Sequence, residues 1–260
     1  MSETTTGIDR TVTPYQASEG KGALDGRRYL ESLRDGREVW YRGQRIEDVT
    51  THPVFSTMAK NVARIYDMQH APETSEIMTY EQENGRRASY SYYLPTAPED
   101  LLLRRANTEI WVREVFGMCG RLPDFCASMV VGYYDIHDQL AELNPDLARN
   151  TRTYLDYARN HDLCLSHGLH DPTMDKSLRP SEDPDRCLRV VKERDDGVVV
   201  RGARFNTFGI FSNEILVSPT YQFNEDEEDF AIWFTIPCNA SGLKQVAREA
   251  FSGRNPLDHP

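Results

Sequence analysis

The chain has 260 residues, of which 39% are hydrophobic and 27% charged, as is typical of a folded globular protein. Its formal net charge of -11 argues against a nucleic-acid partner, because nucleic-acid binders concentrate positive charge on one face. No apolar run reaches the roughly 18 residues of a membrane span, and the polar N-terminus does not resemble a secretory signal, so we expect no membrane partner. The odd number of cysteines favours reduced thiols and a cytoplasmic location.

The first half of the chain shows mostly helical patterns. Residues 1–22 are polar and predict a disordered lead-in, and residues 23–160 predict a helical N-terminal domain. Asp25 can cap a first helix that ends at Gly36, and a short hairpin follows with its turn at Arg42 and Gly43. Further helices are expected over residues 53–71, 98–118 and 123–143 and after Asn144 and Pro145.

Beyond residue 160 the apolar pattern changes from helical to alternating. Asp196 and Gly197 lie between two β-rich arms and predict a hairpin. Two further strands are expected in 214–223 and 229–237, separated by an acidic loop. We therefore predict an antiparallel β-domain over residues 161–260.

The stretch CLSHGLHDP at residues 164–172 carries a cysteine and two histidines at three-residue spacing. A metal site, a ligand pocket and an ordinary strand with histidines are the alternatives. On a strand, Cys164 and His170 share one face and His167 lies on the other, which opposes a three-ligand site. On a helix the three would share a stripe, but Gly168 and Pro172 disfavour a continuing helix. No phosphate-binding glycine loop or nucleophile-elbow motif occurs elsewhere.

Four stretches of the sequence together carry a family resemblance. They are YLESLRDGREVWYRGQRIEDVTTHPVF at 29–55, GRLPDF at 120–125, LCLSHGLHDP at 163–172 and LRVVKERDDGVVVRGAR at 188–204. The chain resembles the N-terminal and middle parts of the 4-hydroxyphenylacetate 3-hydroxylase large component family, two-component flavin monooxygenases with an acyl-CoA-dehydrogenase-like fold. The resemblance implies an α+β fold with a helical N-terminal domain and a small antiparallel, β-barrel-like domain. We expect the helical bundle that follows in the family to be absent from this chain.

The resemblance also implies a reaction and its cofactor. A separate flavin reductase would supply reduced FAD, which reacts with molecular oxygen to a C4a-hydroperoxide that hydroxylates a phenolic or related activated small molecule. The chain would then be an oxygenase subunit or half-subunit. Such a site favours the ligand pocket among the three readings of residues 164–172, and we predict no metal.

The family's substrate residues map onto this sequence one by one. Arg121 and His167 match the catalytic, substrate-binding arginine and histidine, and Phe125 replaces a tyrosine that also binds substrate. A cation and an imidazole beside a phenolic oxygen would favour its deprotonation. Without the resemblance, Arg121 would fit equally well as a solvated residue at a helix start. For Phe125 we expect core packing even within the family. Losing the tyrosine hydroxyl suggests a different or less discriminated substrate.

The resemblance assigns flavin contacts to His167, Leu169, Asn206 and Thr207, and a surface turn is the alternative for Thr207. A branch of the family resembles 4-hydroxybutyryl-CoA dehydratase and binds an iron-sulfur cluster. The placement of Cys119 and Cys126 opposes that cluster here, and Cys126 reads as a helix-face core residue.

Members of the family are about twice as long as this chain. A fragment, half of a split enzyme and a non-catalytic relative are the alternatives. We favour a paired arrangement in which a second chain supplies the C-terminal helical bundle. A non-catalytic structural partner of such a split enzyme is the alternative function.

Overall fold

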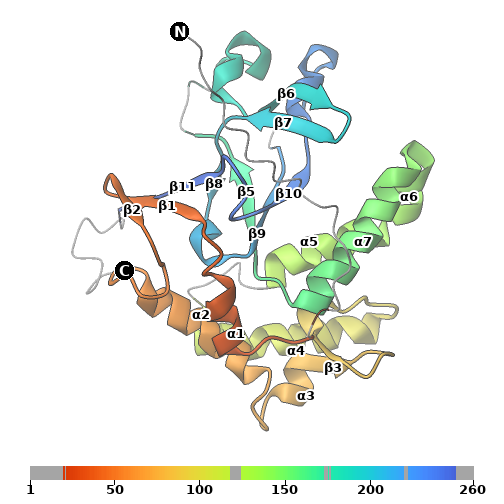
Figure 1. The fold of residues 1–260 in the computed structure, drawn as a ribbon. Coiled ribbons are helices and arrows are strands. Elements are labelled where there is room, and N and C mark those ends of the chain that lie inside the picture. The colour runs from red at the N-terminus through yellow and green to blue at the C-terminus, as the bar shows by residue number, and fades with distance from the viewer. Residues whose placement is uncertain are drawn as a thin grey trace.

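The computed structural model describes residues 20, 22–117, 124–172, 175, 177–219 and 222–249. Most strands lie in the upper part of the view and most α-helices in the lower part, although β3 lies beside α3 and α4 (Figure 1). The α-helices are α1 Gly26–Ser32, α2 Ser56–Met68, α3 Ser75–Met78, α4 Pro98–Glu114, α5 Asp124–Asp135, α6 His137–Leu143 and α7 Pro145–His161. The 3-10 helices are η1 Tyr90–Tyr92, η2 Pro180–Glu182, η3 Pro184–Arg186, η4 Gly209–Phe211 and η5 Glu225–Phe230. No described helix is long and apolar enough to cross a membrane.

The described strands form four sheets. They are β1 Glu38–Tyr41, β2 Gln44–Ile46, β3 Thr79–Glu81, β4 Arg87–Ser89, β5 Leu165–His170, β6 Arg189–Arg194, β7 Gly197–Arg201, β8 Phe205–Asn206, β9 Glu214–Val217, β10 Phe234–Pro237 and β11 Lys244–Ala247. The sheet orders are β11-β1-β2, β10-β9-β5-β8, β3-β4 and β6-β7. Helix and sheet together make the α+β fold that the sequence predicted.

Local chemistry explains where several helices begin and end. Asp25 caps α1 by accepting a hydrogen bond from the amide of Arg28 at 2.7 Å, as expected. The predicted helix over residues 123–143 is two helices, α5 and α6, separated at Ile136. The His137 ring forms a hydrogen bond with the Tyr134 carbonyl oxygen at 2.6 Å. In a continuous helix, this oxygen would accept a backbone hydrogen bond from the following turn.

Both predicted hairpins form. Arg42 and Gly43 link β1 to β2 with φ of 51° and 74°, the left-handed values that suit a two-residue hairpin turn. In the β6–β7 hairpin, Arg194 pairs with Gly197, so the turn lies one residue earlier than predicted. Gly197 instead opens β7 with φ 148°.

The sheet that carries the histidine motif is mixed rather than antiparallel. β9 pairs in parallel with β5, while β10 and β8 pair antiparallel with β9 and β5. The prediction of an antiparallel sheet was therefore wrong for this pair. Residues 171–213 return the chain to the end of the sheet where β5 began, and an alternating sequence pattern does not reveal such a connection. No sheet in the described ranges closes on itself, so the barrel-like arrangement is not confirmed.

Contacts cross the predicted boundary between residues 160 and 161. β1 pairs in parallel with β11, and one core cluster joins Cys164 and Phe211 to residues of α1, α2 and α4. The Leu24 amide also donates to Asp162 Oδ2 at 2.9 Å. The division into residues 23–160 and 161–260 stays a prediction, and residues 1–19 and 21 of the expected lead-in lie outside the described part.

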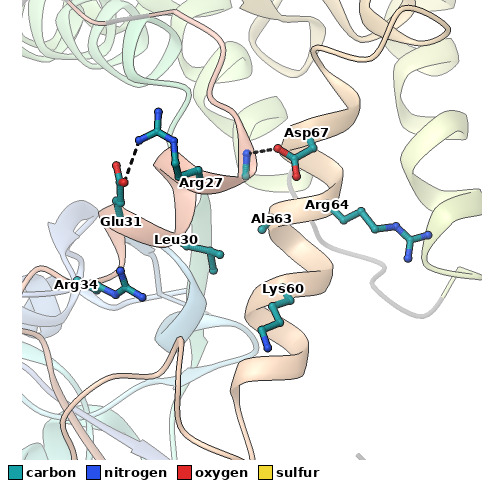
Figure 2. Close-up of a pocket in the computed structure, with 9 residues that line it drawn as sticks. Arg27, Leu30, Glu31, Arg34, Lys60, Ala63, Arg64 and Asp67 are labelled. Carbon is teal, nitrogen blue, oxygen red and sulfur yellow. Dashed lines mark hydrogen bonds and ion pairs between the residues drawn. The ribbon is translucent and has the colours of Figure 1, made fainter.

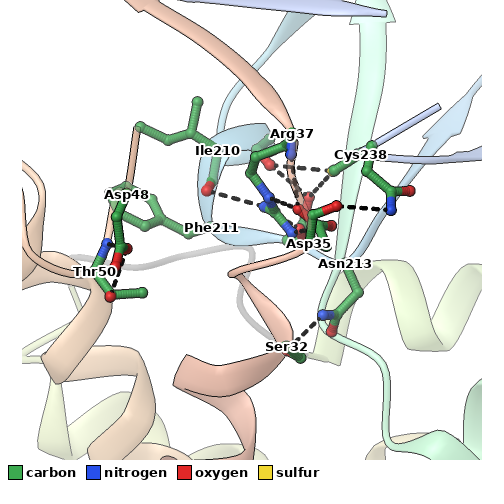
Figure 3. Close-up of polar contacts among 12 residues, drawn as sticks. Ser32, Asp35, Arg37, Asp48, Thr50, Ile210, Phe211, Asn213 and Cys238 are labelled. Carbon is green, nitrogen blue, oxygen red and sulfur yellow. Dashed lines mark hydrogen bonds and ion pairs between the residues drawn. The ribbon is translucent and has the colours of Figure 1, made fainter. Parts of the chain in front are cut away.

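A polar cluster ties the segment after α1 to η4 (Figure 3). Arg37 is 5% exposed and donates from Nη1 to the carbonyl oxygens of Ile210 at 3.1 Å and Ser212 at 2.7 Å. Asp35 holds the same guanidinium at 2.8 Å. Tyr29 adds a third bond, from its hydroxyl to the Phe211 carbonyl oxygen at 2.7 Å. Three consecutive carbonyl groups are thus satisfied from the N-terminal segment.

Candidate active site

His167 lies in the middle of β5, beside the parallel strand β9. The register sets His167 opposite Leu216, and its side chain is 5% exposed. Its Nε2 atom is 2.7 Å from the Ser218 hydroxyl oxygen just beyond β9, and Ser218 is 3% exposed. Whether imidazole or hydroxyl donates depends on the tautomer. Ser218 was not predicted, because only the pairing of β5 with β9 brings it to the histidine.

Phe125 packs beside His167. It lies in the first turn of α5, and its ring centroid is 5.9 Å from the imidazole centroid at an angle of 42°. Its 39% exposure is that of a surface residue, so core packing does not describe it. The structure therefore brings together His167 and Phe125, which are far apart in the sequence.

Arg121 lies outside the described residues, but Asp124, three positions later, belongs to a partly buried ion pair. Asp124 opens α5, and Arg104 of α4 approaches its carboxylate at 3.7 Å. Burial raises the pKa of Asp124, and the Arg104 charge acts in the opposite direction. Arg104 also donates to the Ser128 hydroxyl at 2.6 Å. Arg104 and Asp124 line a cavity of about 330 Å³ along α4. The sequence reasoning missed the pair; an acidic residue directly after Pro123 was the available signal.

The residues predicted to contact flavin lie on both faces of β5. His167 lies on one face, and Leu169 lies where the register with β8 shifts by one residue between Gly168 and His170. Asn206 pairs with Gly168, and its amide donates to the Ser166 hydroxyl at 2.9 Å on the other face. A ligand that touches His167 and Asn206 must therefore extend around the sheet edge, where β8 is the last strand.

The Asn206 side chain also shapes the turn that follows β8. Its carbonyl oxygen accepts the Phe208 amide at 2.8 Å, which folds the backbone toward η4. Thr207 is exposed in this bend. Both the nitrogen and the oxygen of the Asn206 side-chain amide are thus hydrogen-bonded within the protein, while Thr207 is exposed to solvent.

Cys164, His167 and His170 do not converge. Cys164 packs in the core with α2, His167 faces Phe125, and His170 is exposed at the end of β5. Burial raises the pKa of the Cys164 thiol, which disfavours the thiolate form that binds metals. Within the described ranges, no group of three histidine, cysteine or acidic side chains is arranged to hold a metal ion.

The described cysteines also bear on the cluster alternative. Cys126, Cys164, Cys187 and Cys238 have free thiols, and Cys126 is 1% exposed on α5 in a core cluster. The prediction that Cys126 is a core residue is confirmed. Cys119 lies outside the described residues.

A separate cavity of about 570 Å³ lies between α1 and α2 (Figure 2). Its charged lining is largely paired: Asp67 accepts the Gly26 amide at 2.7 Å, and Arg27 meets Glu31 at 3.0 Å. None of its lining residues belongs to the predicted site.

Comparison with solved structures identifies the class of protein. The fold matches a crystal structure of the oxygenase component of 4-hydroxyphenylacetate 3-monooxygenase complexed with FAD and 4-hydroxyphenylacetate, with a TM-score of 0.82 and 37% identity over 92% of this chain. It also matches an archaeal 4-hydroxybutyryl-CoA dehydratase from N. maritimus, with a TM-score of 0.77 at 24% identity, which supports the fold alone. The fold is thus that of flavin-dependent oxygenase components and their structural relatives.

The sequence comparisons identify the family. Residues 25–260 match the family described as 4-hydroxyphenylacetate 3-hydroxylase N terminal, and the chain belongs to this family. The oxygenase component of 4-hydroxyphenylacetate 3-monooxygenase from Thermus thermophilus is 37% identical over 92% of this chain and 49% of that protein. The resemblance predicted from the four motifs is confirmed. The chain spans about half the length of these relatives.

Proposed function

We propose that this chain is the substrate-side part of the oxygenase component of a two-component monooxygenase. It would hydroxylate a phenolic or related activated small molecule with reduced FAD and molecular oxygen in the cytoplasm, with a flavin reductase as transient partner. The observation that carries the proposal is the buried His167, bonded to Ser218 and packed against Phe125, in a chain of this family.

The chemistry of the proposed reaction assigns roles to three residues. A phenol becomes a stronger nucleophile when it loses its proton, so the site needs a group that accepts this proton and a charge that stabilises the phenolate. His167 is the proton acceptor in this proposal, and Arg121 supplies the positive charge. Phe125 offers an aromatic face but no hydroxyl, so a substrate hydroxyl has one polar partner fewer than in a tyrosine-containing site.

Groups at the edge of the mixed sheet fit one side of a flavin ring. Thr207 is exposed there, and the adjacent Phe205 is 43% exposed. Beside them, the buried Arg204 and Asp171 form an ion pair, yet Arg204 Nε and Asp171 Oδ2 have no hydrogen-bond partner within the described ranges. When bound, reduced FAD would supply the activation of oxygen. Thr207 and Asn206 would border the flavin ring at the sheet edge. His167 and Leu169 would contact the part of the flavin that extends around this edge.

Exposed apolar side chains support a second chain as partner. Seven described residues with large apolar side chains are more than half exposed, several of them on elements far apart in the sequence: Phe116 91%, Leu143 80%, Val246 75%, Leu102 61%, Trp233 58%, Leu101 55% and Val198 53%. Such surface is a common mark of protein contact. A C-terminal helical bundle, which the relatives carry in their other half, is the partner we propose.

A non-catalytic structural subunit is the second candidate function. The observation that favours it is Phe125, because the site lacks the hydroxyl that family members place near the substrate. The two candidates differ in one respect, whether His167 takes part in chemistry.

The experiment that tests the proposal starts with native mass spectrometry of the chain purified from its source. A second chain of similar size, with FAD present only in the complex, would support the split oxygenase. In that complex we expect His167→Ala to lower hydroxylation about 100-fold, a common size for the loss of a general base. His137→Ala, at the distant start of α6, is the control. Unchanged hydroxylation with FAD still bound would favour the structural subunit.

A further inference from the structure

A small closed cavity lies where α2, α4, η1 and the end of α7 meet. Its volume is about 10 Å³ for the centre of a water-sized sphere, which is near the lower limit for holding one water molecule. All of its lining residues are buried, and none belongs to the predicted active site. The inference drawn from it therefore stands apart from the proposed function.

Three polar atoms on residues that line this cavity have no hydrogen-bond partner within the described part of the chain. They are Tyr66 Oη, Asn107 Oδ1 and Trp111 Nε1, on side chains that are 3%, 1% and 2% exposed. Leaving such groups unpaired away from water costs about 1–3 kcal/mol each. Native interiors leave only a few such atoms per hundred residues unpaired, and three around one cavity call for a shared partner.

We propose that this cavity binds one structural water molecule. The Trp111 indole N–H would donate to its oxygen, and the water would donate one hydrogen to the Asn107 carbonyl oxygen. Its remaining capacity would serve Tyr66, whose hydroxyl otherwise has only the Cys164 thiol, a weak partner, beside it. One water can satisfy a donor and an acceptor together, which neither a cation nor an anion can do.

The proposal does not depend on how the Asn107 amide is oriented. The amide nitrogen donates to the Ser91 hydroxyl at 3.0 Å. If the amide were rotated, its oxygen would accept from Ser91 and its nitrogen would face the cavity. A water molecule would then accept from that nitrogen, so either orientation leaves one amide group for it.

The water would connect two separate helices. Tyr66 belongs to α2, while Asn107 and Trp111 lie one turn apart on α4. The other polar residues of the lining are Gln69, Ser89, Ser91, Tyr92 and Asp162. Bound water of this kind is part of the packed core and exchanges slowly with solvent.

The chain has three tryptophans, which give the test an internal control. Trp40 Nε1 already donates to Glu38 at 2.8 Å, and Trp233 is 58% exposed. The experiment is a water-to-indole nuclear Overhauser measurement on the full chain labelled with ¹⁵N-tryptophan. We expect the Trp111 indole proton alone to show the cross-peak sign of a long-lived water, together with strong protection from hydrogen exchange. Trp111→Phe assigns the signal.

The proposal fails if the Trp111 indole proton shows no cross-peak to a long-lived water while the Trp40 indole signal shows that the fold is intact. A crystal structure of the same chain gives a second reading. Ordered density within hydrogen-bond distance of Trp111 Nε1 and Asn107 would support the proposal, and a dry cavity would overturn it. Asn107→Leu, which removes the amide, is expected to abolish the cross-peak, but the wild-type measurement decides even if this variant does not fold.

Discussion

At the scale of single residues, Asp162 is a carboxyl in unusual surroundings. It ends α7 in the left-handed conformation, with φ 49°, and is 3% exposed. Its Oδ2 atom accepts the Leu24 amide at 2.9 Å and the Gln69 side-chain amide at 2.6 Å. Burial raises its pKa to about 6, although these two bonds and the charges of His70 and Arg28 act in the opposite direction.

This raised pKa predicts a specific pH dependence of stability. The folded state binds the Asp162 proton more tightly than the unfolded chain, so the contribution is present below about pH 4 and is lost as pH rises through about 6. A shift of about 2 units corresponds to a loss of up to about 3 kcal/mol. Asp162→Asn should remove this loss, because asparagine keeps an acceptor and tolerates the left-handed conformation.

Urea unfolding of wild type and Asp162→Asn between about pH 4 and 7 measures this difference. The exposed Asp156→Asn is the matched control and should retain the wild-type dependence. Parallel curves for wild type and Asp162→Asn would show that the carboxyl is not buried as described.

At the scale of elements, helix α1 packs unusually close to α2. A Cβ atom on Gly26 would lie 2.4 Å from the Ala63 carbonyl oxygen, a distance that no side chain tolerates without movement of the backbone. Gly132 within α5 is the opposite case, since a Cβ there would meet nothing within 4 Å. Close packing against α2 thus explains the glycine at position 26, whereas packing does not require a glycine at position 132.

We expect opposite effects of alanine at these two positions. Gly132→Ala should stabilise the protein by about 0.5–1 kcal/mol, because alanine loses less backbone entropy in a helix. Gly26→Ala should destabilise it by about 1–3 kcal/mol through overpacking against α2. The free energy of unfolding in urea measures both. Equal effects of the two substitutions would contradict the close approach of α1 and α2.

The bonds from the N-terminal segment to η4 make a second prediction at this scale. Tyr29→Phe removes the donor to the Phe211 carbonyl oxygen, at an expected loss of about 1 kcal/mol. Tyr92→Phe is a matched control, because its buried hydroxyl donates to the Leu163 carbonyl oxygen at 2.6 Å, away from η4. Hydrogen exchange of the Phe211 and Ser212 amides should accelerate in Tyr29→Phe only. Similar exchange in both variants would argue against a role of Tyr29 in holding the turn.

At the scale of the whole molecule, the predicted domains share a core. Cys164 and Phe211 pack with residues from α1, α2 and α4, and β1 pairs with β11 along four residues. Strand pairing between chain segments this far apart links their stabilities, because neither strand keeps its partner when the other unfolds.

We therefore predict that the chain unfolds in a single cooperative transition. Tryptophan fluorescence, which reports on Trp111 of α4, and far-ultraviolet circular dichroism should follow the same denaturation curve. Two separated transitions would instead support independent domains divided near residue 160.

The sequence by itself determined the local elements and the family. Caps, turn residues and apolar spacing predicted the start of α1, the two hairpins and most helices, because these depend on residues close together in the chain. The exceptions have local causes that pattern alone does not show, such as the His137 ring at the break between α5 and α6. His167 and Phe125 were singled out from motifs.

Only the tertiary structure decided which of these residues meet. The Ser218 hydroxyl and the His167 ring are 51 positions apart in sequence, and their contact depends on the parallel pairing of β5 with β9. The antiparallel pairing of β5 with β8 sets Asn206 on the opposite face from His167. Strand direction and facing follow from how long connections return the chain, a property of the whole fold that no local pattern of side chains encodes.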